Sequence, residues 1–255
     1  VVEEGRAAGV KLRGGQIIRA KDAVISNASK WDTMKLIPDG SVSDLMNWQA
    51  DVDNTPICKS FMHLHIGIDG SGLDKELDAH HTIVNDWSAG VEAEQNVVLI
   101  SIASILDPSL APPGKHVIHA YLPATEPFEP WEGLDRRSSE YADMKVERSK
   151  VLWEAIERVI PDVKGRVEVE MVGTPLTHQR FLRRHKGTYG CLGLCAEDGE
   201  TKTVDITTPL EGLLQVGDSV FPGPGLPAVA ASGVIAANSL VPFWEQCQVI
   251  DAVVP

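Results

Sequence analysis

The sequence is poor in cysteine, in positive charge and in long apolar runs, and each shortage excludes a class of protein. Only four of its 255 residues are cysteines, without C-x-x-C spacing, so a disulfide-rich scaffold is not indicated. A formal net charge of −13 argues against a nucleic-acid partner. The longest mostly apolar stretch, 226–241, is too short and too polar for a membrane span. No signal peptide is visible, so we expect a protein that is not secreted and keeps its thiols reduced.

The familiar short catalytic motifs are missing as well. The sequence has no P-loop, no zinc-ligand spacing and no recognisable Ser–His–Asp set. The glycines of residues 67–72 do not have the G-x-G-x-x-G spacing of a dinucleotide fingerprint. The sequence therefore identifies no catalytic residue and predicts no metal site.

The most informative segment that is present is a strand, a turn and a helix of small residues at 213–240. Pro222, Gly223, Pro224 and Gly225 interrupt regular structure, and Pro227 suits the first turn of a helix. The helix that follows is rich in alanine, so that another backbone or a flat ligand can approach it closely. Its N-terminus offers free N–H groups to an anionic ligand group, and the acidic side chain just before the turn can accept hydrogen bonds from hydroxyls. A plain strand-to-helix turn with a crowded helix is the alternative.

This segment resembles the C-terminal flavin-binding motif of FAD-dependent amine-oxidase-type proteins, and within them the branch of phytoene desaturases and prolycopene isomerases. The hairpin and strand at 9–28, with a two-residue turn predicted at Gly14-Gly15, match a segment of the same FAD domain. Three further strings are similar to the isomerase-like branch: Asn85-Asp86-Trp87 with the strand that follows, WEGLDRR at 131–137, and GTPLTHQRFLRR at 173–184. One departure is the segment 191–205, where the family has a loop with Pro-Gly before its last FAD strand.

The resemblance implies an α/β (α+β) fold, a partial Rossmann-like FAD domain with an inserted mixed-sheet substrate domain. Residues 1–30 and 206–245 would form the FAD-binding segments, 31–205 the substrate domain and 246–255 a tail. The family carries its glycine fingerprint near its N-terminus, in a part that the sequence does not contain. We therefore expect either a longer protein or a reduced relative, whose truncated domain would dock on another molecule.

The function implied by the resemblance is FAD-dependent cis–trans isomerisation or desaturation of a carotenoid-like apolar polyene. The implied cofactor is FAD, unless this chain has lost it, and the implied cofactor-binding residues are Ser26, Asn27, Gly217, Asp218, Gly225, Leu226, Pro227 and Ala228. The alternative is a non-catalytic relative that serves as an interaction subunit of a photosynthetic membrane complex. The implied location is the plastid stroma or thylakoid surface, or the cytoplasm of a bacterium.

Histidines form the remaining candidate clusters. Residues 59–68 alternate, with Phe61, His63 and His65 on one face of a predicted strand and aliphatic side chains on the other. Two histidines at i and i+2 can share a metal, but the sequence places no third ligand. A polar sheet face is favoured, and the wall of a substrate tunnel comes second. His178, beside the arginines of 180–184, is either part of an acid/base or anion site or part of a solvated helix face.

Two structural expectations follow. Residues 1–30 and 206–241 should lie together in one layer, with the strand at 23–28 buried between neighbours. The helix at 228–240 should be mostly buried, with its N-terminus opening on a cleft, so that replacing Ala231 with Leu overpacks it.

Overall fold

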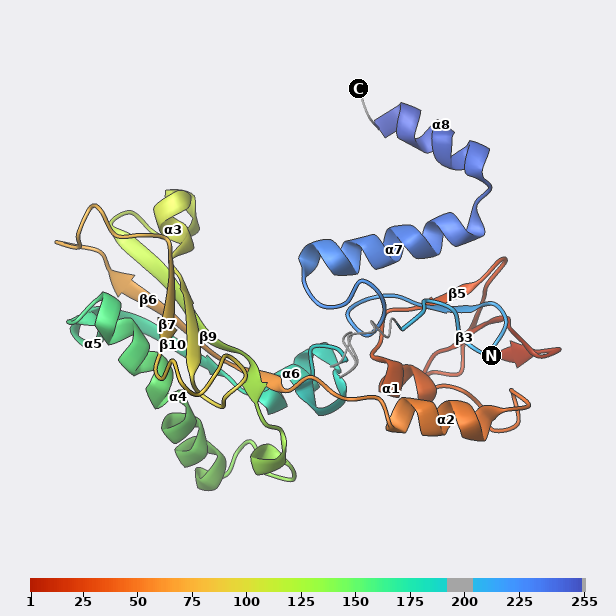
Figure 1. The fold of residues 1–255 in the computed structure, drawn as a ribbon, viewed down its shortest axis with the longest axis horizontal. Helices are drawn as coiled ribbons and strands as arrows, with labels where there is room; N and C mark the ends of the chain where they lie inside the picture. The colour runs from red at the N-terminus through yellow and green to blue at the C-terminus, as the bar shows by residue number, and fades with distance from the viewer. Residues whose placement is uncertain (192–203, 254–255) are drawn as a thin grey trace. The chain divides into compact units, whose positions relative to one another are not determined.

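The protein is described here by a computed structural model covering residues 1–191 and 204–253, and its chain divides into two compact units (Figure 1). Unit 1 consists of Val1–Cys58 and Tyr189–Pro255, and unit 2 of Lys59–Thr188. The segment 31–58, assigned from the sequence to the inserted region, thus belongs with unit 1. The roles of the units as cofactor and substrate domains stay predictions, and most of the divergent 191–205 segment lies outside the described residues.

Unit 2 is built on a five-stranded sheet in which every pairing is antiparallel. Its strand order is β10-β6-β9-β8-β7, with these bounds: β6 Ser60–Asp69, β7 His80–Val84, β8 Val97–Ser101, β9 Lys115–Glu126 and β10 Val167–Gly173. The α/β class is confirmed with one refinement. The inserted sheet is antiparallel throughout, whereas a parallel pairing lies in unit 1.

The longest helix of unit 2 covers one face of this sheet. α4 Ser139–Val159 lies along it in Figure 1, with α5 Val163–Arg166 following; α3 Ala103–Leu106 and α6 Pro175–Leu182 are shorter. Met62, Leu64 and Ile66 of β6 point into the core with Leu152 and Ile156 of α4, and all five are at most 3% exposed. The alternation predicted for residues 59–68 is therefore confirmed.

The start and end of α4 follow the sequence. Ser138 is its N-cap, and its Oγ accepts a hydrogen bond from the backbone N–H of Tyr141 at 3.1 Å. The helix ends at Val159, two residues before Pro161, which cannot continue it. α6 begins with Pro175 behind a capping box formed by Thr174 and Thr177.

Unit 1 has short elements and three small core clusters in place of one large core. Its strands are β1 Val2–Glu3, β2 Arg6–Ala7, β3 Gly9–Lys11, β4 Ile17–Arg19, β5 Val24–Ser26 and β11 Leu213–Gln215, and its helices are α1 Lys30–Met34, α2 Leu45–Asp53, α7 Leu226–Leu240 and α8 Phe243–Val253. β5 and β11 pair in parallel, with Gln215 opposite Ser26, and Ala7 N–H donates to Glu211 O at 2.8 Å. The N- and C-terminal segments therefore lie together, as predicted.

Three details of unit 1 differ from the prediction. The strand expected to be buried at 23–28 is short, and Ile25 is 48% exposed, because β11 is the strand that pairs with β5 in the described residues. The hairpin turn has three residues rather than the two of Gly14-Gly15, since Leu12 N–H donates to Gln16 O and Gly15 adopts φ +87°. The expected tail at 246–255 carries most of α8.

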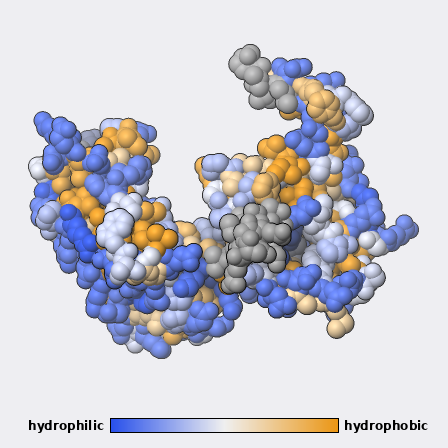
Figure 2. Space-filling model, viewed as in Figure 1, coloured by the Kyte–Doolittle hydropathy of each residue, from blue (hydrophilic) through white to orange (hydrophobic). Residues whose placement is uncertain are grey.

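The expectation that residues 228–240 are mostly buried is wrong. Only Ser232 and Ala236, one turn apart on α7, are buried, whereas Leu226, Val234 and Leu240 are exposed. Figure 2 shows hydrophobic atoms at the surface over α7. α7 thus packs against the rest of unit 1 through one narrow stripe of small side chains. Among the described residues, none of the helices has both the length and the apolar character needed to cross a membrane.

Overpacking requires a buried position. Ala231 is only half-buried, so we now make this prediction for Ala236. Ala236 is fully buried against Ile206, Leu214 and Val220, so Ala236→Leu should lower the free energy of unfolding by about 1–3 kcal/mol. Ala237→Leu is the matched control, because Ala237 is exposed on the same helix. Urea denaturation of the two variants measures the difference, and equal stabilities would contradict this packing.

Candidate functional site

Two regions bring polar or aromatic side chains together, one in each unit. The first, called the β5/β11 edge, comprises Ser26, Asn27, Gly217 and Asp218. Because the strands are parallel, their carboxyl ends meet at the same edge, which is where ligands bind in open α/β sheets. Val216 N–H donates to Ser26 O at 2.9 Å and extends this pairing by one residue.

Gly217 is fixed at this edge by close contacts. Its φ is +104°, and a Cβ atom added there would lie 2.6 Å from Oδ1 of Asn27, so a side chain at 217 would collide with that amide. Gly217 N–H donates to Oγ of Ser232 at 2.8 Å, which ties the edge to the second turn of α7. The structure thus brings Asn27 and Gly217 together, whereas their role in cofactor binding stays a prediction.

The first turn of α7 contains the other predicted cofactor residues, from Gly225 to Ala228. Gly225 is the N-cap with φ +106°, and no side chain of the described residues caps the helix there. A Cβ at Gly225 would meet nothing within 4 Å, and Leu226 is 83% exposed. The N–H groups of this turn are consequently accessible to an anionic group.

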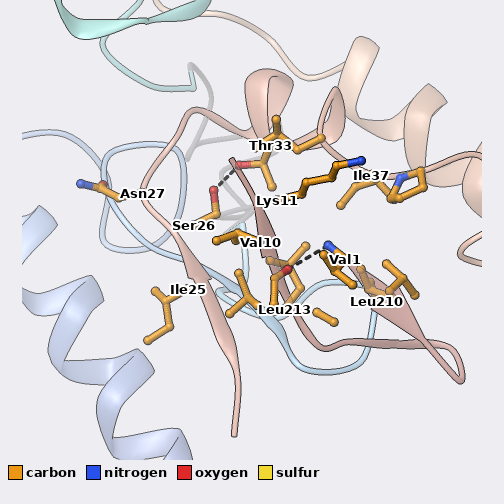
Figure 3. Close-up of a pocket in the computed structure, with 16 residues that line it drawn as sticks. Val1, Val10, Lys11, Ile25, Ser26, Asn27, Thr33, Ile37, Leu210 and Leu213 are labelled. Atoms are coloured by element: carbon orange, nitrogen blue, oxygen red, sulfur yellow. Dashed lines mark hydrogen bonds between the residues drawn. The ribbon is translucent and has the colours of Figure 1, made fainter. Parts of the chain in front are cut away.

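Ser26 also lines a cavity of about 560 Å³ in unit 1 (Figure 3). Its Oγ lies 2.7 Å from Oγ1 of Thr33, so that hydroxyl is already engaged within the protein. Val10, Ile25 and Leu213 make most of the nearby wall apolar. In Figure 3 the side chain of Asn27 lies apart from the other labelled side chains. The cavity therefore suits an apolar group, and the polar part of the site is the β5/β11 edge.

The second region is the open face of the unit 2 sheet, opposite α4. We call it the histidine face, and it comprises Phe61, His63, His65, His119 and Tyr121. Nδ1 of His63 and Nε2 of His119 are 2.7 Å apart, and the rings of His65 and His119 stack with centroids 4.2 Å apart and planes 6° apart. His119 also stacks on Tyr121 at 4.8 Å. Two adjacent antiparallel strands thus present a continuous strip of flat rings.

Burial keeps these imidazoles neutral. Burial, followed by the neighbouring histidines, lowers the pKa of His63 to about 3, and burial with His65 lowers that of His119 to about 4. Burial also lowers the pKa of His65. His178 of α6 packs edge-on against His63 with ring centroids 4.9 Å apart, and burial, then Arg184, lowers its pKa to about 4. His178 therefore belongs to a buried cluster rather than to a solvated helix face.

The sequence missed His119 and Tyr121 as members of this face. Alternation along β9 puts both rings on the same side of the strand. The missing information was the register: His65 lies opposite His119 and His63 opposite Tyr121, across more than fifty residues of chain. His80 of β7 is exposed and His81 is half-buried.

Hollows adjoin the histidine face on both sides. One of about 500 Å³ is lined by Phe61, His63, Leu99, His119 and Tyr121, among others. Another of about 480 Å³ has a more aliphatic wall that includes Val117, Val169 and Met171. Val169 and Met171 of β10 are more than half exposed. An extended apolar molecule would find flat rings and methyl groups there.

Comparison with known proteins finds prolycopene isomerases and a phytoene desaturase that match nearly the whole chain. It is 36% identical over 258 residues to prolycopene isomerase 2, chloroplastic, of an Oncidium hybrid cultivar, and the match covers 99% of this chain and 43% of the relative. It is 35% identical to the chloroplastic prolycopene isomerase of Arabidopsis thaliana, covering 93% and 39%. A neurosporene-forming phytoene desaturase of Rhodobacter capsulatus is 24% identical, covering 94% and 47%. The chain thus spans less than half the length of these relatives.

Among solved structures, an oxidoreductase from Methanosarcina mazei is similar with a TM-score of 0.55 at 18% identity, covering 94% of this chain and 47% of that one. A protein from Pyrococcus furiosus is similar with a TM-score of 0.52, also at 18% identity, covering 91% and 44%. At this level of identity, the two similarities show a shared fold and nothing about activity. No family model matches the chain.

Proposed function

The chain belongs to the carotenoid isomerase and desaturase family, and from that premise we propose that it forms part of a FAD-dependent enzyme that isomerises or desaturates a carotenoid-like polyene. The observation that carries the proposal is the similarity to prolycopene isomerases, which extends through both units at 36% identity. A likeness confined to one unit would support only a shared domain.

The residues of unit 1 fit a flavin at two points. The uncapped first turn of α7 presents N–H groups and the positive end of the helix dipole, which stabilise negative charge on a bound group. Asp218, directly after Gly217, offers a carboxylate to the hydroxyls of a ribityl chain. Gly225 leaves room beside the turn because a Cβ there would meet no neighbour. A bound flavin would supply the redox chemistry, which side chains of this kind do not provide.

The histidine face is our candidate for the surface that contacts the polyene. A conjugated chain is flat and apolar, and the stacked rings of His65, His119 and Tyr121 offer a flat surface of matching character. Because the imidazoles are neutral when no ion is bound to them, they then impose little charge on an apolar ligand. Their role here is binding and orientation of the substrate.

Asp218→Ala should weaken flavin retention. Losing a charged hydrogen-bond acceptor costs about 1.5–3 kcal/mol, so the Kd for FAD should rise at least about tenfold. The measurement is titration of the flavin-stripped protein with FAD, followed by flavin fluorescence. Asp39→Ala is the control, because Asp39 is an exposed carboxylate of the same unit. Unchanged affinity in Asp218→Ala, or equal weakening in the control, would remove Asp218 from the site.

The second candidate function is a non-catalytic interaction subunit. Large exposed side chains of unit 1, such as Ile18, Ile25 and Leu36, favour contact with another protein. A protein that binds no flavin and leaves a cis-carotenoid unchanged would support this alternative. The chloroplastic relatives suggest a plastid location, and association with a thylakoid complex stays an expectation.

A further inference from the structure

Three imidazoles of the histidine face, from two neighbouring strands, converge within a small volume. His63 and His65 come from β6 and His119 from β9, and their ligand nitrogens all lie within 4.8 Å of one another. One pair, Nδ1 of His63 and Nε2 of His119, is 2.7 Å apart. This set completes the pair that the sequence left without a third ligand.

The spacing fits a shared metal ion after small side-chain rotations. With metal–nitrogen bonds of about 2.0–2.1 Å, two nitrogens on a tetrahedral ion lie about 3.3 Å apart. The observed separations, from 2.7 Å to at most 4.8 Å, bracket that value. The rings of His65 and His119 are now stacked, and the second side-chain torsion of histidine has a broad preference, so both can turn toward a common point without moving the backbone.

The donor set selects the kind of metal. Neutral imidazoles suit Zn²⁺, Cu²⁺ and Ni²⁺, whereas Mg²⁺ and Ca²⁺ prefer oxygen ligands. Three protein ligands leave a position for water or another ligand, and the hollow of about 500 Å³ beside His63 and His119 provides the space. We propose that His63, His65 and His119, all of unit 2, form a binding site for a divalent late transition-metal ion such as Zn²⁺.

Calorimetric titration with Zn²⁺ tests this site. The protein should be prepared without a histidine tag and freed of metal by a chelator. We expect saturable binding of one equivalent. His119→Gln should weaken it at least about tenfold, since loss of even an outer-shell group costs a metal site 10- to 100-fold. His80→Gln is the matched control, because His80 lines the same hollow but lies outside the triad. Circular dichroism checks that both variants are folded.

A second measurement needs no variant. In nitrogen-detected imidazole NMR of the unmodified protein, one equivalent of Zn²⁺ should shift the ring signals of His63, His65 and His119 together and leave His116 unmoved, since His116 is hydrogen-bonded to Ser104. Absence of saturable binding, equal weakening in His80→Gln, or shifts confined to other histidines would overturn the proposal. Flavin affinity is measured separately, so failure here leaves the flavoenzyme proposal standing and the reverse also holds.

Discussion

Arg148→Ala should lower the free energy of unfolding of unit 2 by about 3–5 kcal/mol, because it leaves a buried carboxylate without its cation. Glu126 is fully buried, and its Oε1 accepts hydrogen bonds from Trp131 Nε1 at 2.8 Å and Arg148 Nε at 3.0 Å. Arg148 Nη2 donates to Oε2 at 2.8 Å and completes a two-point contact. Urea denaturation followed by tryptophan fluorescence measures the loss.

The pH dependence gives this prediction a second readout. Burial raises the pKa of Glu126, while the hydrogen bonds from Arg148 and Trp131 lower it. Without Arg148 the pKa should rise further. A carboxyl whose pKa is raised in the folded state stabilises that state only when protonated, so the deficit of Arg148→Ala should shrink as the pH falls.

Two comparison variants isolate the buried charge. Lys150→Ala removes a cation from the same helix whose pair with Glu147 is exposed, and it should change stability by at most about 1 kcal/mol. The double variant Arg148→Met with Glu126→Gln should recover much of the loss, since no uncompensated charge stays buried. A loss in Arg148→Ala no larger than that in Lys150→Ala would show that the pair contributes little.

Sequence reasoning succeeded where the signal was local. The alternation of Met62 and Leu64 with His63 and His65 correctly indicated the two faces of β6. Resemblance predicted that residues 1–30 and 206–241 lie together, which local patterns cannot indicate and which the pairing of β5 with β11 confirms. Each of these features depends on residues close in the chain or on a family motif.

The parts that could not be predicted depend on register and on packing between distant segments. His119 joins His63 only through the pairing of β6 with β9, and the Glu126–Arg148 contact joins a strand to a helix. The small residues of α7 signalled close packing correctly at Ser232 and Ala236, but not which other faces would be covered. Composition reveals that a helix can pack closely, whereas the number of its neighbours is a property of the whole unit.

Gly190→Ala should destabilise unit 1 by about 3 kcal/mol through two effects that act at the same residue. Gly190 has φ +111°, a region that side chains disfavour, and a Cβ there would lie 2.5 Å from the backbone oxygen of Asp218. Backbone atoms cannot swing aside as the end of a flexible side chain can, so Asp218 itself must move. If Asp218 holds the flavin, the variant should also bind FAD more weakly.

Gly225→Ala separates the two effects. Gly225 has a similar φ of +106°, but a Cβ there would meet nothing within 4 Å, so this variant carries the backbone strain without the collision. Gly190→Ala should therefore be less stable than Gly225→Ala by about 1–3 kcal/mol in urea denaturation. Equal stabilities would mean that the loop bearing Asp218 yields freely to the added methyl group. Gly190 would then have no positioning role, and Asp218 would be held at the β5/β11 edge by the contacts of Gly217 with Asn27 and Ser232 instead.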